Sequence, residues 1–297
     1  MEHNCCDICG NPSIYQDYFV SEPWRSTKPI RYCRECELYY LSERPELDEI
    51  VGHYKKYYKM SLIAHLIKLF VSKARVQFQS RFINHNIGAV EGNALEIGSP
   101  NGNLIRNCLI NGGKVSVDFS LQSDVVRKDI ECFSNIDKLN SQKFDFIAAS
   151  HVVEHFLNPV HDMSHLLDLL RIGGFIFIEV PMSPNYSERP SVIRRYLNTD
   201  HMVNFSVKSL IKFLELFSLT IFSEQIYEIN LKCLHNRIDE KKIIAQIITE
   251  GVGDPYKKCD AFLTLARLFV KNKLFTETKN TDFVFGKNIQ IIAKKIA

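Results

Sequence analysis

Residues 93–118 read NALEIGSPNGNLIRNCLINGGKVSVD, and this stretch decides the fold. The pattern predicts a short apolar strand, a turn that carries Gly98 and Gly102, a helix at 103–110 and a second strand that ends at Asp118. A strand, a helix and a strand in this order indicate an α/β fold with a parallel sheet.

The glycines and carboxylates of this unit indicate a nucleoside site. Gly98 lets a ligand approach the backbone closely, and Gly102 lets the helix begin close to the strand. Asp118, at the end of the second strand, can accept hydrogen bonds from both hydroxyls of a ribose. Glu96 would repel a pyrophosphate at the helix N-terminus, whereas it suits a cation. We therefore expect a cationic nucleoside rather than a dinucleotide.

The composition predicts a globular enzyme with one α/β domain and a smaller unit. Of the 297 residues, 45% are hydrophobic and 11% aromatic, which is enough for a sizeable core. The formal net charge of +3 indicates no general attraction to nucleic acid. The N-terminus lacks the pattern of a signal peptide, and the apolar run at 62–71 is too short to span a bilayer. We expect a cytoplasmic protein without a membrane span.

Two Cys-x-x-Cys pairs near the N-terminus predict a structural zinc site formed by Cys6, Cys9, Cys33 and Cys36. Two such turns aim four thiolates at one point and leave no coordination position for catalysis. Cys5 is an alternative to Cys6, although only Cys6 has the two-residue spacing. A redox dithiol and unrelated buried cysteines are the alternative interpretations.

The pattern Glu96-x-Gly98-x-x-x-Gly102 resembles motif I of the class I S-adenosylmethionine (SAM)-dependent methyltransferases, whose cofactor carries an ammonium and a sulfonium. Family members often have a glycine in place of Pro100. The cysteine pairs, Pro45 and the tyrosines that follow resemble methyltransferases that combine an N-terminal zinc-binding module with this domain. Many of those enzymes act in bacterial pathways for sugars and surface polysaccharides.

The resemblance, which runs to about residue 226, implies a Rossmann-like, seven-stranded, doubly wound sheet with a zinc-binding module. The lysine-rich sequence after it predicts a helical insertion near the C-terminus. The implied parts are a zinc-binding module at 1–45, a helical linker or cap at 46–90, and a methyltransferase domain at 91–297 with an insertion at 231–284. The connection at 182–205 carries several arginines and His201, and it suits either a binding lid or a solvated surface.

A further apolar strand, the fourth along the chain, is predicted at 144–149 and leads into Ser-His-Val-Val-Glu-His at 150–155. Ligands of open α/β sheets bind at the carboxyl edge, where this segment would lie. The run from Phe144 to Pro181 resembles the same methyltransferase fold.

The resemblance also implies which residues meet the cofactor. Five residues are expected to hold SAM: Glu96, Gly98, Gly102, Asp118 and His151. Asp129 and Ile130 are expected to meet the adenine amine and ring, although Asp129 also suits a water-facing loop.

Methyl transfer to an alcohol or a carbon requires removal of a proton. His155 is the candidate general base, because a neutral imidazole takes a proton near pH 7, and Glu154 is placed to orient its ring or hold a substrate hydroxyl. Similar nucleotide-sugar C-methyltransferases are assigned a catalytic Glu-His pair, but they have a tyrosine in place of Val152. His151 is the second candidate for the base, and a mechanism without an essential histidine is the third possibility.

We therefore expect a SAM-dependent methyltransferase that modifies a hydroxyl or a carbon of a small sugar-like or nucleotide-linked acceptor, without a nucleic-acid partner. An RNA methyltransferase with a zinc module is one alternative, but residues 1–45 are not strongly basic. A non-catalytic partner protein with this fold is the other alternative, suggested by Pro100 and Val152.

Overall fold

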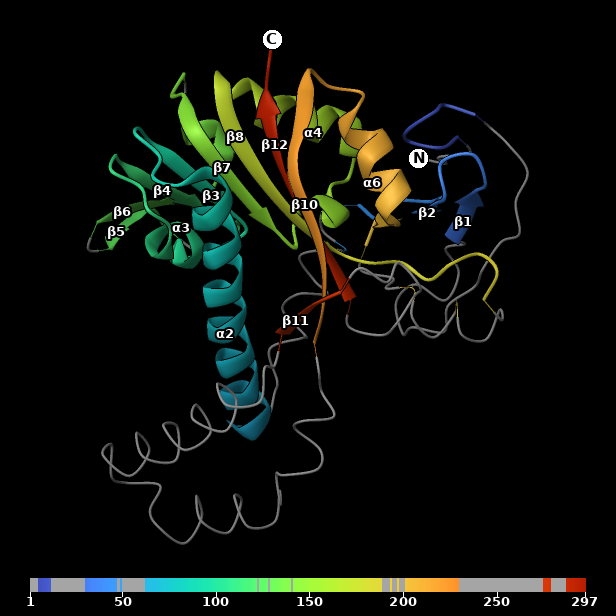
Figure 1. The fold of residues 1–297 in the computed structure, drawn as a ribbon, viewed down its shortest axis with the longest axis horizontal. Helices are drawn as coiled ribbons and strands as arrows, with labels where there is room; N and C mark the ends of the chain where they lie inside the picture. Colours follow the sequence, from blue (N-terminus) through green and yellow to red (C-terminus); the bar gives the residue numbers. More distant parts are fainter. Residues whose placement is uncertain are drawn as a thin grey trace, which may run out of the picture.

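The computed structural model describes residues 5–11, 30–46, 49, 62–121, 123–127, 129–139, 141–188, 193, 197, 201–229, 275–278 and 287–297. These residues form a large mixed sheet with helices packed on it and a small N-terminal hairpin at one side (Figure 1). The fold is mixed α/β, as the sequence predicts.

The large sheet has nine strands in the order β11-β10-β12-β8-β7-β3-β4-β6-β5. Their bounds are β3 (Ala94–Ile97), β4 (Lys114–Val117), β5 (Val125–Arg127), β6 (Ile130–Phe133), β7 (Phe144–Ser150), β8 (Leu170–Pro181), β10 (Leu219–Ile229), β11 (Phe275–Thr278) and β12 (Lys287–Lys295). The five central strands, from β8 to β6, are parallel, whereas β12, β10, β11 and β5 pair antiparallel with their neighbours. The predicted number was seven; the short strands β5 and β11 extend the two edges to nine.

The order of the strands reverses beside β3. The chain adds β4 and β6 on one side of β3 and then returns to add β7 and β8 on the other side. The carboxyl ends of β3, β4 and β7 therefore meet at a topological switch point, which is where open α/β sheets bind ligands.

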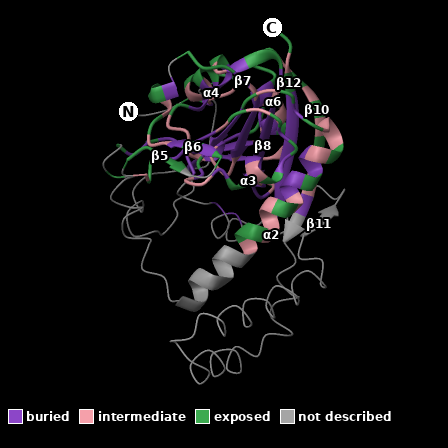
Figure 2. Cartoon of the chain, turned by 90° about the vertical axis from the view of Figure 1, so that its left-hand side faces the viewer, coloured by how far each residue is buried: buried purple, intermediate pink, exposed green. Residues whose placement is uncertain are grey.

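Apolar side chains alternate between the two faces of these strands and create two cores. On one face, Ala94 and Phe146 pack with Phe82 and Ile83 of α2 (Leu62–Ile87) and with α3 (Asn103–Asn107). On the other face, residues of β3 and β7 pack with α4 (Pro159–Asp168) and α6 (Val207–Leu214). Figure 2 shows the buried residues concentrated in the strands between these helices.

Helix α3 is shorter than the predicted 103–110 and ends at Asn107. The residues after it are held by other partners: Leu109 N–H donates to Oδ1 of Asn84 in α2, and Ile110 forms a parallel bridge with Val90. This pairing replaces the last predicted turn of the helix.

The N-terminal hairpin is joined to the rest of the chain by a shared sheet. Strands β1 (Ile30–Cys33) and β2 (Leu38–Leu41) form a three-stranded antiparallel sheet with β9 (Val203–Phe205). Arg44 makes a 2.6 Å ion pair with Asp7 and donates to the carbonyl of Leu157. Figure 1 places this hairpin beside α6, away from β5 and β6. The described part of the predicted module at 1–45 thus packs directly on the rest of the chain.

Within the predicted insertion at 231–284, the structure describes only β11, which pairs with β10. The remainder of the insertion and the arginines of the connection at 182–205 lie outside the described residues. Among the helices that the structure describes, none is long and apolar enough to cross a membrane.

Candidate functional site

The turn between β3 and α3 depends on two glycines with positive φ, 74° at Gly98 and 59° at Gly102. A Cβ atom on Gly98 would lie 2.3 Å from Cγ2 of Val152, and one on Gly102 would lie 2.5 Å from Cδ1 of Ile130. Both positions therefore require glycine, because of the backbone conformation and because of neighbouring side chains. The first contact also shows that the turn after β3 touches the loop after β7.

Glu96 supports this turn from within the protein. Its buried Oε2 accepts hydrogen bonds from the backbone N–H groups of Leu104 (2.8 Å) and Ile105 (3.1 Å), in the first turn of α3. Burial raises the pKa of Glu96 to about 7, although these N–H groups favour the ionised form. The carboxylate expected to hold the cofactor is thus used to fix the start of the helix below the turn.

Asp118 lies beside Gly98 at the carboxyl edge. Gly98 N–H donates to the carbonyl of Val117, the residue before Asp118, and Asp118 N–H donates to the carbonyl of Phe133. One carboxylate oxygen of Asp118 accepts from Ser120 N–H at 2.8 Å. The structure therefore brings Gly98 and Asp118 together, as the sequence predicts.

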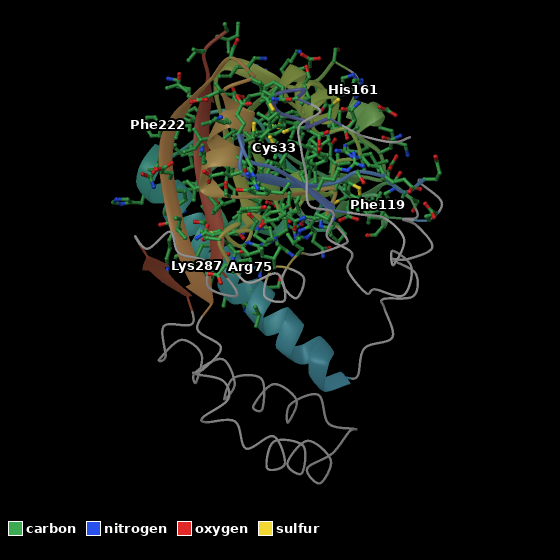
Figure 3. All side chains as sticks on the ribbon, turned by 90° about the vertical axis from the view of Figure 1, so that its right-hand side faces the viewer. Cys33, Arg75, Phe119, His161, Phe222 and Lys287 are labelled. Carbon is green, nitrogen blue, oxygen red and sulfur yellow. The ribbon has the colours of Figure 1, made fainter. Side chains whose placement is uncertain are left out.

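Phe119 is a candidate that the sequence reasoning missed. It follows Asp118 directly, and 64% of its surface is exposed. Figure 3 shows it at the surface, far from the other labelled exposed phenylalanine, Phe222. The available signal was an aromatic residue placed directly after the acidic end of a strand.

The structure does not bring Asp129 and Ile130 to this edge. Strand β6 runs parallel to β4, with Ile130 aligned with Lys114 and Phe133 aligned with Val117. Asp129 and Ile130 therefore lie at the amino end of β6, and Asp129 makes a 3.3 Å ion pair with Arg106. Ile130 is fully buried against Gly102. The segment before them, Val125–Arg127, is the antiparallel edge strand β5, and the parallel strand starts only at Ile130.

His151, in the loop after β7, lies between two buried carboxylates. Its Nδ1 is 3.3 Å from Oε1 of Glu154, and its Nε2 is 3.0 Å from Oε1 of Glu179. Glu179 also accepts hydrogen bonds from Tyr227 (2.9 Å) and Gln290. Burial lowers the pKa of His151, but the two carboxylates outweigh burial, so the net pKa is raised. Glu154 was expected to orient His155, yet its closest imidazole is that of His151.

Glu154, His155 and His201 form a second cluster at the same edge. Each residue offers one metal-ligand atom, and these atoms lie within 4.8 Å of one another. The rings of His155 and His201 meet edge to face, with centroids 4.7 Å apart. His201 lies two residues before β9, and burial lowers its pKa to about 4. The sequence reasoning noticed His201 only as part of a long connection, because nothing local links it to Glu154.

The four cysteines of the two Cys-x-x-Cys pairs converge in the N-terminal hairpin. The sulfur atoms of Cys6, Cys9, Cys33 and Cys36 lie within 4.8 Å of one another. Sγ of Cys9 is 3.7 Å from Sγ of Cys33, and a tetrahedral zinc site with bonds of about 2.3 Å requires sulfur separations of about 3.8 Å. Cys5 is exposed and lies outside the group. The donor set and its geometry fit a structural zinc ion.

Residues 63–224 match the profile of the methyltransferase domain. The chain belongs to this methyltransferase family. It is a SAM-dependent methyltransferase, and this confirms the prediction of the enzyme class from the sequence. No curated protein matches the chain significantly.

Three solved structures illustrate what the chain is similar to. Coclaurine N-methyltransferase, bound to N-methylheliamine and S-adenosylhomocysteine, has 10% identity and a TM-score of 0.46, over 85% of this chain and 90% of that chain. The 1,6-didemethyltoxoflavin-N1-methyltransferase of Burkholderia thailandensis, with bound 1,6-didemethyltoxoflavin and S-adenosylhomocysteine, has 13% identity and a TM-score of 0.44. The match covers 71% of this chain and 91% of that chain. The MccD protein has 12% identity and a TM-score of 0.48, and the match covers 73% of this chain and 96% of that chain.

Proposed function

We propose that this methyltransferase modifies a hydroxyl or a carbon of a small sugar-like or nucleotide-linked acceptor, held against Glu154, His155 and His201. The observation that carries the proposal is the contact between the turn after β3 and the loop after β7, where Gly98 meets Val152. A cofactor bound over the turn after β3 would present its methyl group to an acceptor held at the loop after β7.

On the cofactor side, the backbone at Gly98 and Gly102 and the carboxylate of Asp118 would hold SAM. SAM supplies a methyl group on a sulfonium, which is a good leaving group. Asp118 is placed to bind the ribose hydroxyls, and the exposed ring of Phe119 offers a face on which the adenine can stack. The protein's main task is to align the acceptor in line with the methyl carbon.

On the acceptor side, His155 is the proposed general base. Its ring is partly exposed, whereas His151 has a carboxylate beside each ring nitrogen. Burial opposes ionisation of Glu154, but the neighbouring His151, with His155 and His201, holds its pKa at about 2. The resulting negative charge would stabilise the imidazolium that forms when His155 takes a proton from the acceptor.

In the N-terminal hairpin, Cys6, Cys9, Cys33 and Cys36 would hold a structural zinc ion. Strand β2 follows these cysteines and pairs with β9, and Leu41 N–H donates to the carbonyl of Met202, next to His201. We assign the zinc module a supporting role, in which it fixes β9 and thereby the position of His201. A similar combination of zinc module and methyltransferase domain in sugar pathways supports the choice of acceptor class.

The acceptor is tested by measuring transfer of labelled methyl groups from SAM to three panels: nucleotide sugars, the corresponding free sugars, and RNA. We expect labelling of at least one nucleotide sugar, and loss of it in His155→Ala with SAM binding preserved. His85→Ala, an exposed histidine of α2, is the control. Labelling of RNA alone would contradict the proposed acceptor, and full activity in His155→Ala would contradict the role of the base.

A further inference from the structure

We infer that Glu154, His155 and His201 form a binding site for a divalent first-row transition metal ion, separate from the four-cysteine group. The three ligand atoms lie within 4.8 Å of one another and come from two segments, the 3₁₀ helix Val153–His155 and His201, two residues before β9. Two imidazole nitrogens and one carboxylate oxygen suit zinc, iron or cobalt, and three protein ligands leave coordination positions open.

Glu154 supplies a buried carboxylate whose nearest partners in the described structure are imidazole rings. Its side chain is 1% exposed, and neither carboxylate oxygen has a hydrogen bond of good geometry among the described residues. The nearest groups are imidazole nitrogens, Nδ1 of His151 at 3.3 Å and Nε2 of His201 at 4.0 Å. A buried carboxylate is costly without hydrogen bonds or a cation, and a metal ion would compensate it directly.

His201 is already oriented as a metal ligand. Its Nδ1 lies 3.3 Å from Oδ1 of Asn204, so a proton on Nδ1 leaves the lone pair on Nε2, which faces Glu154. Metal-binding histidines commonly donate their second ring N–H in this way. The backbone is fixed as well, because Met202 N–H donates to the carbonyl of Glu154 at 2.8 Å. Bonds of about 2.1 Å at tetrahedral angles place donor atoms about 3.4 Å apart, so the 4.0 Å between Glu154 and His201 needs a side-chain shift of about 0.6 Å when the ion binds.

The catalytic role that we give the ion depends on the proposed function, whereas the inference that the site binds an ion does not. An acceptor hydroxyl oxygen that occupies an open position would be held in place, and the ion would lower the pKa of that hydroxyl. With the ion bound, His155 would be a ligand instead of the general base of the metal-free site, and the proton lost from the hydroxyl would pass to solvent water.

A competing pair of histidines must be removed before metal binding is measured. His161 and His165 are exposed, four residues apart on α4, with ring centroids 4.3 Å apart. Two histidines at this spacing on one helix face can bind a transition metal by themselves. His161 is at the surface in Figure 3, away from the cysteine group. The titrations therefore use the His161→Ala/His165→Ala protein.

The test is a calorimetric titration of the His161→Ala/His165→Ala protein, with zinc in its cysteine group, by Co²⁺. The visible absorption spectrum of the titrated protein is then recorded. We expect one Co²⁺ per chain without the sulfur-to-cobalt charge-transfer band that exchange at the cysteines would produce. Glu154→Gln and His201→Ala should abolish this binding. Asn204→Ala, which keeps all three ligands, should weaken it about 10- to 100-fold.

Absence of Co²⁺ binding, or affinity unchanged in both Glu154→Gln and His201→Ala, would overturn the inference. Each variant is also titrated with S-adenosylhomocysteine without Co²⁺, which reports whether it is folded. Cofactor binding without Co²⁺ binding would reject the metal site and leave the proposed function intact. Co²⁺ binding without cofactor binding would support the metal site and contradict the proposed function.

Discussion

Nδ1 of His151 lies 3.3 Å from Oε1 of Glu154. The glutamate that adjoins His155 in the sequence is therefore closest in space to a different histidine. His151 also reaches Glu179, so one imidazole lies between two carboxylates that are both buried. In the proposed function, this arrangement gives His151 an electrostatic role rather than direct contact with the acceptor.

Replacing His151 with glutamine should strongly destabilise the protein. The change leaves Glu154 and Glu179 buried without their nearest imidazole, and breaking a buried ion pair in this way costs about 3–5 kcal/mol. Urea unfolding measures the loss, and His85→Gln on the exposed face of α2 should change the free energy of unfolding little. A His151→Gln protein as stable as the wild type would show that the two carboxylates do not depend on this imidazole.

Gly98→Ala should lower both stability and cofactor affinity more than Gly173→Ala does. Both glycines have positive φ, 74° and 81°, so each alanine has a backbone cost of about 1–2 kcal/mol. Only at Gly98 does the new Cβ meet a side chain, since no described atom lies within 4 Å of the corresponding position at Gly173. Adding Val152→Ala should recover the steric part of the loss. Equal effects of the two single substitutions would show that the contact with Val152 is unimportant.

Glu96→Gln should alter how stability depends on pH. The pKa of Glu96 is about 7 in the folded protein against 4.5 for the free side chain, so folding takes up a proton between these values. The wild type should therefore lose about 3 kcal/mol relative to the variant as pH rises from about 4.5 to about 7. Glutamine keeps an oxygen that can accept from Leu104 and Ile105.

Urea unfolding across this pH range gives the difference between the two proteins. Arg106 and Cys108 are the other titratable groups that act on Glu96, and both remain in the variant. Parallel stability curves for wild type and variant would mean that folding does not shift the pKa of Glu96.

Phe119→Ala should weaken binding of S-adenosylhomocysteine about 2- to 10-fold, which is the range expected for loss of one aromatic stacking contact. Stability should change little, because Phe119 is largely exposed. Phe222→Ala is a suitable control, since Phe222 is also more than half exposed and lies on β10. Equal cofactor affinity in wild type and Phe119→Ala would remove this residue from the adenine site.

Removal of zinc from the cysteine group should reduce methyl transfer more than cofactor binding. Without the ion the β1–β2 hairpin loses its anchor, and β9, which positions His201, loses its partner β2. Gly98 and Asp118 lie on strands that this change does not touch. Cys33→Ser and chelator-treated wild type should behave alike in zinc content, activity and cofactor titration. A zinc-free protein with full activity would contradict the supporting role of the module.

Local sequence patterns predicted the parts of the site that are built within one segment. The β3–α3–β4 unit follows from glycine and apolar spacing over residues 93–118, and the convergence of the cysteines follows from two short turns. The loop at 150–155 was placed at the carboxyl edge because an apolar run precedes it. In each case the residues that determine the geometry are close in the sequence.

Contacts between distant segments could not be predicted in this way. His201 reaches Glu154 through contacts between distant segments: β9 pairs with β2, and Met202 N–H donates to the carbonyl of Glu154. Asp129 was misplaced because it comes before the parallel strand β6, whereas the preceding strand, β5, is a short antiparallel edge strand. The β-propensity of the residues does not distinguish an antiparallel edge strand from a parallel inner strand. The neighbouring strands in the sheet decide which of the two forms.

The most direct test of the account is a calorimetric titration of the purified protein with S-adenosylhomocysteine, beside Asp118→Ala and the control Asp124→Ala. Asp124 is an exposed carboxylate that pairs with Lys138, away from Gly98. The account predicts micromolar binding by the wild type and the control, and loss of binding in Asp118→Ala. Equal affinity in all three proteins, or no binding by folded wild type, would contradict a cofactor site at the carboxyl ends of β3 and β4.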